Sequence, residues 1–204
     1  MLRRTLLTTA ATTALGFSAH AFAAPAVGQK APDFTLTDTA GKTVRLSDFK
    51  GKHVVLEWVN PSCPYVRKHY DSANMQGTQK EATALGVVWL AINSTESASY
   101  DYLPAAKLAR WMTDQKAAPT VTLMDEDGKA GQSYGARTTP HMYIVNPQGI
   151  LIYAGGIDSI PSSRQEDVKT AVNYVKQGVR QALAGPPLSN PTTRPYGCSV
   201  KYKA

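Results

Sequence analysis

The order of the hydrophobic segments predicts a mixed α/β sandwich. Two near-continuous apolar runs, 53–59 and 87–92, are typical of central strands that are covered on both faces. A segment able to form a helix separates them, and this order predicts a parallel β–α–β unit. Two alternating stretches, 34–46 and 141–156, each contain a glycine turn and predict antiparallel hairpins. Parallel strands linked by helices and closed by a hairpin make an α/β sandwich.

The predicted elements cover most of the chain after residue 33. Pro64 suits the first position of a helix, where its missing N–H costs nothing, and Gly86 ends that helix. In chain order we expect a hairpin over 34–46, a strand over 53–59, a helix over 64–85, a strand over 87–92, a helix over 104–116, a strand over 120–125, a short helix over 129–136, a hairpin over 141–156 and a helix over 164–184.

The first 23 residues have the layout of a secretory signal peptide. Arg3 and Arg4 precede a short apolar segment, and Ala21-Phe-Ala23 matches a cleavage pattern. The apolar segment is too short to span a bilayer; a disordered or membrane-anchored N-terminus is the alternative. We therefore predict a periplasmic or secreted protein, cleaved near Ala23. Its expected parts are a signal peptide over 1–23, a domain over 24–184 and an irregular tail over 185–204.

Composition narrows the functional classes. The chain of 204 residues is 43% hydrophobic and 18% charged, as expected of a globular domain with a core. Its formal charge is +7, and loss of the signal peptide, with Arg3 and Arg4, leaves +5. Because the basic residues are scattered, we expect no nucleic-acid binding. No other apolar run could span a membrane, so stable membrane insertion is not expected. We also expect no cofactor.

The stretch 60–69, NPSCPYVRKH, places Cys63 between a buried strand and a helix. A cysteine attacks as the thiolate, and the free N–H groups and dipole at a helix start favour that anion. Arg67, four residues on, is expected on roughly the same side of the helix. The alternative is a buried, unreactive cysteine that packs as a small hydrophobe.

Together these segments resemble the thioredoxin fold. The strand VVLEWVN is followed by Cys63 and a proline at a helix start, and TTPHMYIVN precedes a hairpin and a last helix. More narrowly, VGQKAPDFTLTDTAGKTVRLSDFKGK and SYGARTTPHMYIVNPQGILIYAGGID resemble the alkyl hydroperoxide reductase/thiol-specific antioxidant group, a redoxin family with exported members. The likeness covers about 27–184. It implies a thioredoxin-like three-layer sandwich with an N-terminal β-hairpin extension, and an antioxidant or redox-homeostasis role.

The resemblance also implies roles for particular residues. Cys63 falls on the attacking cysteine, and Thr139-Pro140 falls on a cis bond facing it, whose backbone can pair with an extended substrate. Glu57 falls on a buried acid behind the thiol. Desolvation would raise its pKa, and it could carry a proton for the cysteine. The alternatives are an ordinary trans proline, and a Glu57 that faces solvent or pairs with a nearby lysine.

The chain departs from the family pattern at two places. Val66 stands where the second cysteine of a Cys-x-x-Cys motif would be, so Cys63 has no local resolving partner. Peroxidase members carry a Pro and a Thr before the attacking cysteine and an Arg opposite it, whereas this chain has Leu56, Asn60 and Pro140 there. Asn60 could donate a hydrogen bond to a peroxide, and Arg67 could replace the missing cation. Thiol-disulfide exchange and hydroperoxide reduction therefore both stay open.

The second cysteine of the chain, Cys198, lies in the tail. A tail of about 20 residues is long enough to reach Cys63. Gly197 makes the neighbouring backbone pliable, and Tyr196 and Tyr202 could dock the tail on the domain. Cys198 could resolve a sulfenic acid or mixed disulfide at Cys63, form a static disulfide with it, or pair with another molecule.

Two further alternatives come from other functional classes. Copper-delivery proteins also exist on the exported thioredoxin fold, and a copper- or thiol-binding accessory protein could use Cys63, Cys198, His69 and His141. Their spacing matches no metal motif, so no metal site is predicted. A redox-inert domain with a structural disulfide is the other alternative. The predicted function is an oxidoreductase acting on protein thiols or disulfides, or on small hydroperoxides, with an unidentified reductant.

Overall fold

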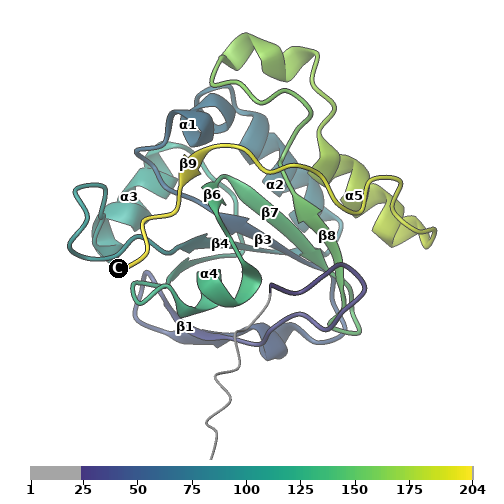
Figure 1. Ribbon diagram of the computed structural model, residues 1–204, viewed down its shortest axis with the longest axis horizontal. Helices are drawn as coiled ribbons and strands as arrows, with labels where there is room; N and C mark the ends of the chain where they lie inside the picture. The colour runs from purple at the N-terminus through teal and green to yellow at the C-terminus, as the bar shows by residue number, and fades with distance from the viewer. Residues whose placement is uncertain (1–23, 204) are drawn as a thin grey trace, which may run out of the picture.

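The computed structural model describes residues 24–203 (Figure 1). The predicted signal peptide, 1–23, lies outside the described residues. Within 24–203, none of the helices has the length and apolar character needed to cross a bilayer. The described chain forms one central sheet with helices on both faces, which confirms the predicted three-layer α/β sandwich.

Seven strands form the central sheet, in the order β2-β1-β5-β4-β3-β7-β8. The three inner strands β3, β4 and β5 are parallel, whereas β1–β2 and β7–β8 are antiparallel hairpins, as predicted. The N-terminal hairpin is continuous with the sheet, because β1 pairs with β5. The strands are β1 (Thr35–Asp38), β2 (Thr43–Arg45), β3 (Val54–Trp58), β4 (Val88–Asn93), β5 (Val121–Met124), β7 (His141–Val145) and β8 (Leu151–Gly155).

Alternating side chains along each strand supply one hydrophobic core on either side of the sheet. On β3, Val55 packs into one core while Leu56 and Trp58 pack into the other. The first core is covered by α1 (Pro64–Asp71), α2 (Asn74–Ala84), α3 (Ala105–Asp114) and α5 (Tyr174–Ala184). The second is covered by the 3-10 helix η1 (Leu46–Phe49) and by α4 (Lys129–Tyr134).

The prediction of one helix over 64–85 was wrong, because the structure has two helices there. α1 and α2 are separated at Ser72 and Ala73, and Ala73 has a left-handed φ of 59° that a continuous helix does not contain. The Gln76 side chain donates a hydrogen bond to the Tyr70 carbonyl at 2.8 Å. This bond satisfies a carbonyl at the end of α1 and so stabilises the break.

The prediction of one helix over 164–184 was also wrong. A short 3-10 helix, η2 (Gln165–Lys169), precedes α5, and the chain between them is not helical. Asn173 begins α5 as an N-cap, since its side chain accepts a hydrogen bond from the backbone N–H of Lys176 at 2.9 Å. The cap explains why α5 starts ten residues later than expected.

The tail crosses the molecule after α5 and docks on the domain (Figure 1). Near its end, a two-residue strand, β9 (Cys198–Ser199), pairs antiparallel with β6 (Thr138–Thr139). The sequence analysis predicted an irregular tail and did not predict this strand pair. The pairing places the tail cysteine beside the segment that directly precedes Pro140.

Candidate active site

Cys63 is the N-cap of helix α1, with φ −77° and ψ 122°. Its backbone N–H donates to the Asn60 carbonyl at 3.0 Å, and its own carbonyl accepts from the N–H of Arg67 at 2.9 Å. The Asn60 side chain accepts from the N–H of Ser62 at 2.9 Å and so stabilises the turn that leads into the helix. The sulfur therefore lies at the positive end of α1, where a thiolate is favoured.

The tail brings Cys198, 135 residues away in sequence, to Cys63. The two Sγ atoms are 2.6 Å apart, closer than two non-bonded sulfurs in ordinary contact. The backbone N–H of Cys198 also points at the Cys63 sulfur, at 3.4 Å. Since a disulfide bond is about 2.05 Å long, a small movement joins the two sulfurs.

The two sulfurs have different surroundings. Burial, together with the hydrogen bond and charge of Cys63, raises the pKa of the Cys198 thiol to about 12. Cys198 therefore keeps its proton at neutral pH. In its thiol form Cys63 donates to the Thr139 carbonyl at 3.0 Å.

The backbone before Pro140 carries the tail. The Thr139–Pro140 bond is cis, as the resemblance implied, and Thr139 is paired with Cys198 in the β6–β9 ladder. Gly197 has a φ of 142°, and a Cβ there would overlap the Thr139 carbonyl. Only glycine lets the chain pass so close to β6. The tail thus occupies the backbone edge predicted to pair with an extended substrate.

Glu57 is fully buried in β3. Its carboxylate accepts hydrogen bonds from Trp89 Nε1 at 2.7 Å, Tyr70 OH at 2.8 Å and Gln79 Nε2 at 3.0 Å. Desolvation raises the pKa of Glu57 despite these three donors. In residues 24–203 its hydrogen bonds go to these three side chains and not to Cys63, so its role in proton transfer stays a prediction.

The two residues predicted to contact a peroxide have other partners. The Arg67 side chain is 59% exposed, and its guanidinium lies 3.7 Å from the Asp71 carboxylate. The Asn60 amide is buried and donates to Thr95 Oγ1 at 3.4 Å. Their assignment to substrate binding stays a prediction.

The two histidines near the site are held as neutral rings. His69 Nε2 lies 3.2 Å from Tyr196 OH, and His141 Nδ1 accepts from the backbone N–H of Arg137 at 3.3 Å. Burial lowers the pKa of His69 to about 4 and that of His141 to about 3. In the part of the chain that the structure describes, no three His, Cys, Asp or Glu side chains are arranged to hold a metal ion.

A buried charged cluster beside the site was not predicted. Lys68 Nζ donates to Asp158 Oδ2 at 3.0 Å, to the Ile160 carbonyl at 2.8 Å and to Tyr196 OH at 3.2 Å. Tyr196 OH in turn donates to Asp158 Oδ1. Tyr196 had been expected to dock the tail, but no sequence signal indicated its partners, which lie 128 and 38 positions away.

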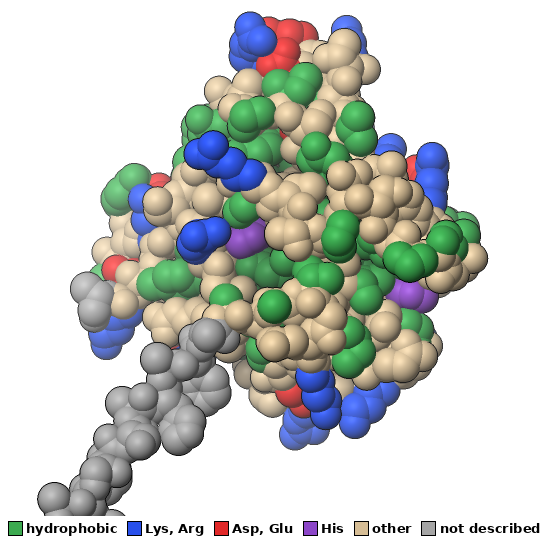
Figure 2. Space-filling model, turned by 45° about the vertical axis from the view of Figure 1, so that its right-hand side comes forward, with side chains coloured by type: hydrophobic (Ala, Val, Ile, Leu, Met, Phe, Trp, Pro, Cys, Tyr) green, Lys and Arg blue, Asp and Glu red, His purple; other side chains and the backbone are tan. Residues whose placement is uncertain are grey.

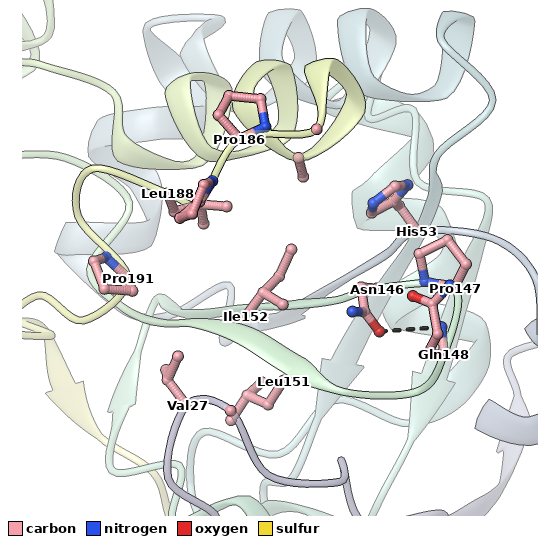
Figure 3. A pocket seen from close by; sticks show the side chains of 14 residues that line it. Val27, His53, Asn146, Pro147, Gln148, Leu151, Ile152, Pro186, Leu188 and Pro191 are labelled. Carbon is pink, nitrogen blue, oxygen red and sulfur yellow. Dashed lines mark hydrogen bonds between the residues drawn. The ribbon is translucent and has the colours of Figure 1, made fainter.

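The surface offers an apolar hollow away from the cysteines. A cavity of about 530 Å³ opens between β8 and the residues that follow α5, and its labelled apolar side chains include Leu151, Ile152 and Leu188 (Figure 3). Neither cysteine lines it. Figure 2 shows Lys and Arg side chains in separate groups over the visible face, in agreement with the scattered basic residues of the sequence.

Comparison with known proteins identifies the family. The sequence profile of the AhpC/TSA family matches residues 27–154. The chain belongs to the AhpC/TSA family. It is 26% identical over 132 residues to the thiol-disulfide oxidoreductase ResA of Bacillus subtilis (strain 168). That match covers 61% of this chain and 64% of the relative, so it spans slightly less than two thirds of the relative's length.

Solved structures agree with the fold. An uncharacterized conserved protein from Geobacillus kaustophilus is 26% identical, with a TM-score of 0.74 over 87% of this chain and 93% of the other. The thioredoxin domain of a thiol-disulfide oxidoreductase from Bacteroides vulgatus is 22% identical, with a TM-score of 0.52 over 72% and 98%; this likeness shows the fold alone. The predicted thioredoxin-fold redoxin is confirmed, and the family and the sequence relatives support the predicted oxidoreductase class.

Proposed function

We propose that the protein is an exported thiol-disulfide oxidoreductase in which Cys63 attacks and Cys198 resolves. The observation that carries the proposal is the 2.6 Å separation of the two sulfurs, in a chain whose Cys-x-x-Cys position holds Val66. The family and the similarity to ResA support the same class of reaction. The tail thereby supplies the second sulfur that the local motif lacks. Export follows from the predicted signal peptide.

Two exchange steps complete the reduction of a substrate disulfide. The Cys63 thiolate attacks one substrate sulfur, the substrate S–S bond breaks, and the other sulfur leaves as a thiolate. That thiolate takes the proton of Cys198, which then attacks the Cys63 sulfur. The Cys63–Cys198 bond forms, and the second substrate sulfur leaves as a thiolate. Two electrons have passed to the substrate, and an external thiol reductant returns them by the reverse exchange.

Access decides the kind of substrate. Cys63 is only 2% exposed, because β9 and the adjoining tail cover it. A protein disulfide or thiol reaches this sulfur only after β9 leaves β6. The freed edge then offers backbone donors and acceptors to an extended segment, which is how an exposed strand binds a peptide. Protein thiols and disulfides are therefore the proposed substrates.

Hydroperoxide reduction is the second candidate, and the AhpC/TSA match favours it. The Cys63 thiolate would attack one peroxide oxygen and the O–O bond would break. The leaving alkoxide or hydroxide would take a proton from solvent and depart as an alcohol or water. Cys198 would then condense with the Cys63 sulfenic acid to give the disulfide and water. The same sulfur pair serves both candidates, so the substrate distinguishes them.

Reaction with 5,5′-dithiobis(2-nitrobenzoate) tests the cysteine roles. The reduced protein should release two equivalents of thionitrobenzoate and end, by mass, as an unlabelled Cys63–Cys198 disulfide. Cys198→Ser should release one equivalent and keep a label on Cys63. A wild-type product that keeps one or two labels would refute the resolving role. Peroxide consumption by the wild type and by Cys63→Ser, under the same reductant, decides the second candidate.

A further inference from the structure

The tail is held on the domain on both sides of Cys198. Before it, the backbone N–H of Thr193 donates to the Ala154 carbonyl of β8 at 3.2 Å. After it, the N–H of Val200 donates to the Arg137 carbonyl at 3.1 Å. Backbone bonds of this kind hold a segment in place but do not single out one residue as the one that sets the position of the sulfur.

One side chain of the tail enters the buried charged cluster. The Lys68 and Asp158 side chains are 0% and 1% exposed, and a buried ion pair is stable only where further hydrogen bonds satisfy it. The Tyr196 hydroxyl meets that need, because it accepts from Lys68 and donates to Asp158. His69 lies against the same hydroxyl as a neutral ring. Three buried side chains, Lys68, Asp158 and His69, thus contact the Tyr196 hydroxyl.

The cluster joins the two segments that carry the sulfurs. Lys68 is on α1, five residues after Cys63, and Tyr196 is two residues before Cys198. Gly197, the single residue between Tyr196 and Cys198, lies so close to β6 that a Cβ on it would overlap the β6 backbone at Thr139. The chain between the Tyr196 hydroxyl and the Cys198 sulfur therefore has little conformational freedom, and the position of the hydroxyl determines the position of the sulfur.

We infer that Tyr196 is the positioning residue for resolution: its hydroxyl, bound by the buried Lys68–Asp158 pair, holds Cys198 within bonding distance of Cys63. This inference rests on the proposed function, since it explains how the second exchange step is made fast. Exchange rates depend on access and on the placement of the attacking sulfur. The Tyr196 ring also packs edge-on against Tyr65, with centroids 5.9 Å apart, so Tyr196→Phe removes the hydroxyl and keeps that contact.

The test separates the two exchange steps in Tyr196→Phe. Thionitrobenzoate release under limiting reagent has a first phase, attack by Cys63, and a second phase, resolution by Cys198. The variant should slow the second phase about tenfold or more, since a hydrogen bond to a buried charge is among the stronger ones. The first phase should stay unchanged or become faster, because a looser tail uncovers Cys63.

Tyr202→Phe is the matched control. It removes a hydroxyl from the same tail, on the other side of Cys198, that donates to the Ala136 carbonyl at 2.7 Å. Its second phase should match the wild type. An unchanged second phase in Tyr196→Phe would overturn the inference, and so would equal slowing in both variants. Slowing of both phases together with a lower unfolding midpoint of the reduced protein would show a structural role instead. A wild type without a second phase would refute the proposed function, and the inference with it.

Discussion

Helix α1 carries residues of two buried polar clusters that differ in what they hold together. Tyr70 belongs to what we term the body cluster, and Lys68 and His69 belong to the tail cluster. The body cluster consists of Glu57, Tyr70, Gln79 and Trp89, which lie within the segment from β3 to β4. The tail cluster consists of Lys68, His69, Asp158 and Tyr196, and it joins α1 to the tail.

Burial alone does not distinguish the two clusters, because each contains a carboxylate removed from water. In the body cluster, neutral donors surround Glu57 and fix strands against helices. In the tail cluster, an ion pair is completed by a hydroxyl from a segment that must move if a protein substrate is to reach Cys63. Burial of a polar group is therefore not what indicates a role in the reaction. The better sign is that the group binds a segment that must move, as the tail must here.

Removing the cation of the tail cluster should have the largest effect on stability. Lys68→Met leaves the Asp158 carboxylate buried without its ion-pair partner, which typically costs about 3–5 kcal/mol of the free energy of unfolding. Urea unfolding of the reduced protein measures the loss. Lys52→Met, at an exposed lysine, is the control and should change stability by less than about 0.5 kcal/mol. A cost below about 1 kcal/mol for Lys68→Met would mean that the buried pair contributes little to holding the fold.

The two clusters should respond to pH in opposite directions. Burial lowers the pKa of His69 from 6.5 to about 4, so its contribution to stability is fully present above pH 6.5 and is lost as the pH falls toward 4. The loss is at most about 3 kcal/mol. Burial raises the pKa of Glu57 above 4.5. The destabilisation caused by burying the ionised carboxylate is therefore absent at low pH, and it grows as the pH rises through the folded-state pKa.

Urea unfolding at a series of pH values from 4 to 7 checks this contrast. His69→Gln keeps a polar group near Tyr196 but does not titrate, so it should flatten the loss of stability toward pH 4. Glu57→Gln should remove the opposing trend. If Glu57 carries a proton for Cys63, the same change should slow attack by Cys63 about a hundredfold or more. Equal pH profiles for His69→Gln and the wild type would contradict the assignment of His69.

Displacing the tail upstream of the tail cluster should have the smallest effect. Gly155→Ala places a Cβ against Thr193. The resulting crowding should lower the free energy of unfolding by about 1–3 kcal/mol, and resolution by Cys198 should become a few-fold slower. Gly77→Ala is the matched control, because no atom lies within 4 Å of its added Cβ in helix α2. That change should stabilise the protein by about 0.5–1 kcal/mol. Equal effects at both glycines, measured by urea unfolding, would mean that the tail is loosely held.

The elements that were predicted well are those whose pattern is local. The alternation and apolar runs of β3, β4 and β7 depend only on neighbouring residues, so their positions followed from the sequence within one or two residues. The breaks before α2 and α5 did not follow, because they depend on a left-handed Ala73 and on the Asn173 cap. Neither residue marks a break unless its hydrogen-bonding partners are known.

The candidate site divides in the same way. Cys63 could be found because a strand, a cysteine, a proline and a helix stand next to one another in the chain. The raised pKa of Glu57 could be anticipated from its apolar neighbours, but its three donors could not. Lys68 and Asp158 gave no signal, since a lysine on a short helix is normally exposed and its partner is 90 positions away.

The sequence by itself determined the mixed α/β sandwich, the place of Cys63 at a helix start and the absence of a second cysteine beside it. These features depend on side-chain period and on nearest neighbours. Only the tertiary structure decided that Cys198 lies against Cys63, that β9 pairs with β6, and that Tyr196 reaches a buried ion pair. Contacts between residues more than a hundred positions apart depend on how the folded surfaces meet, and a linear pattern does not record that.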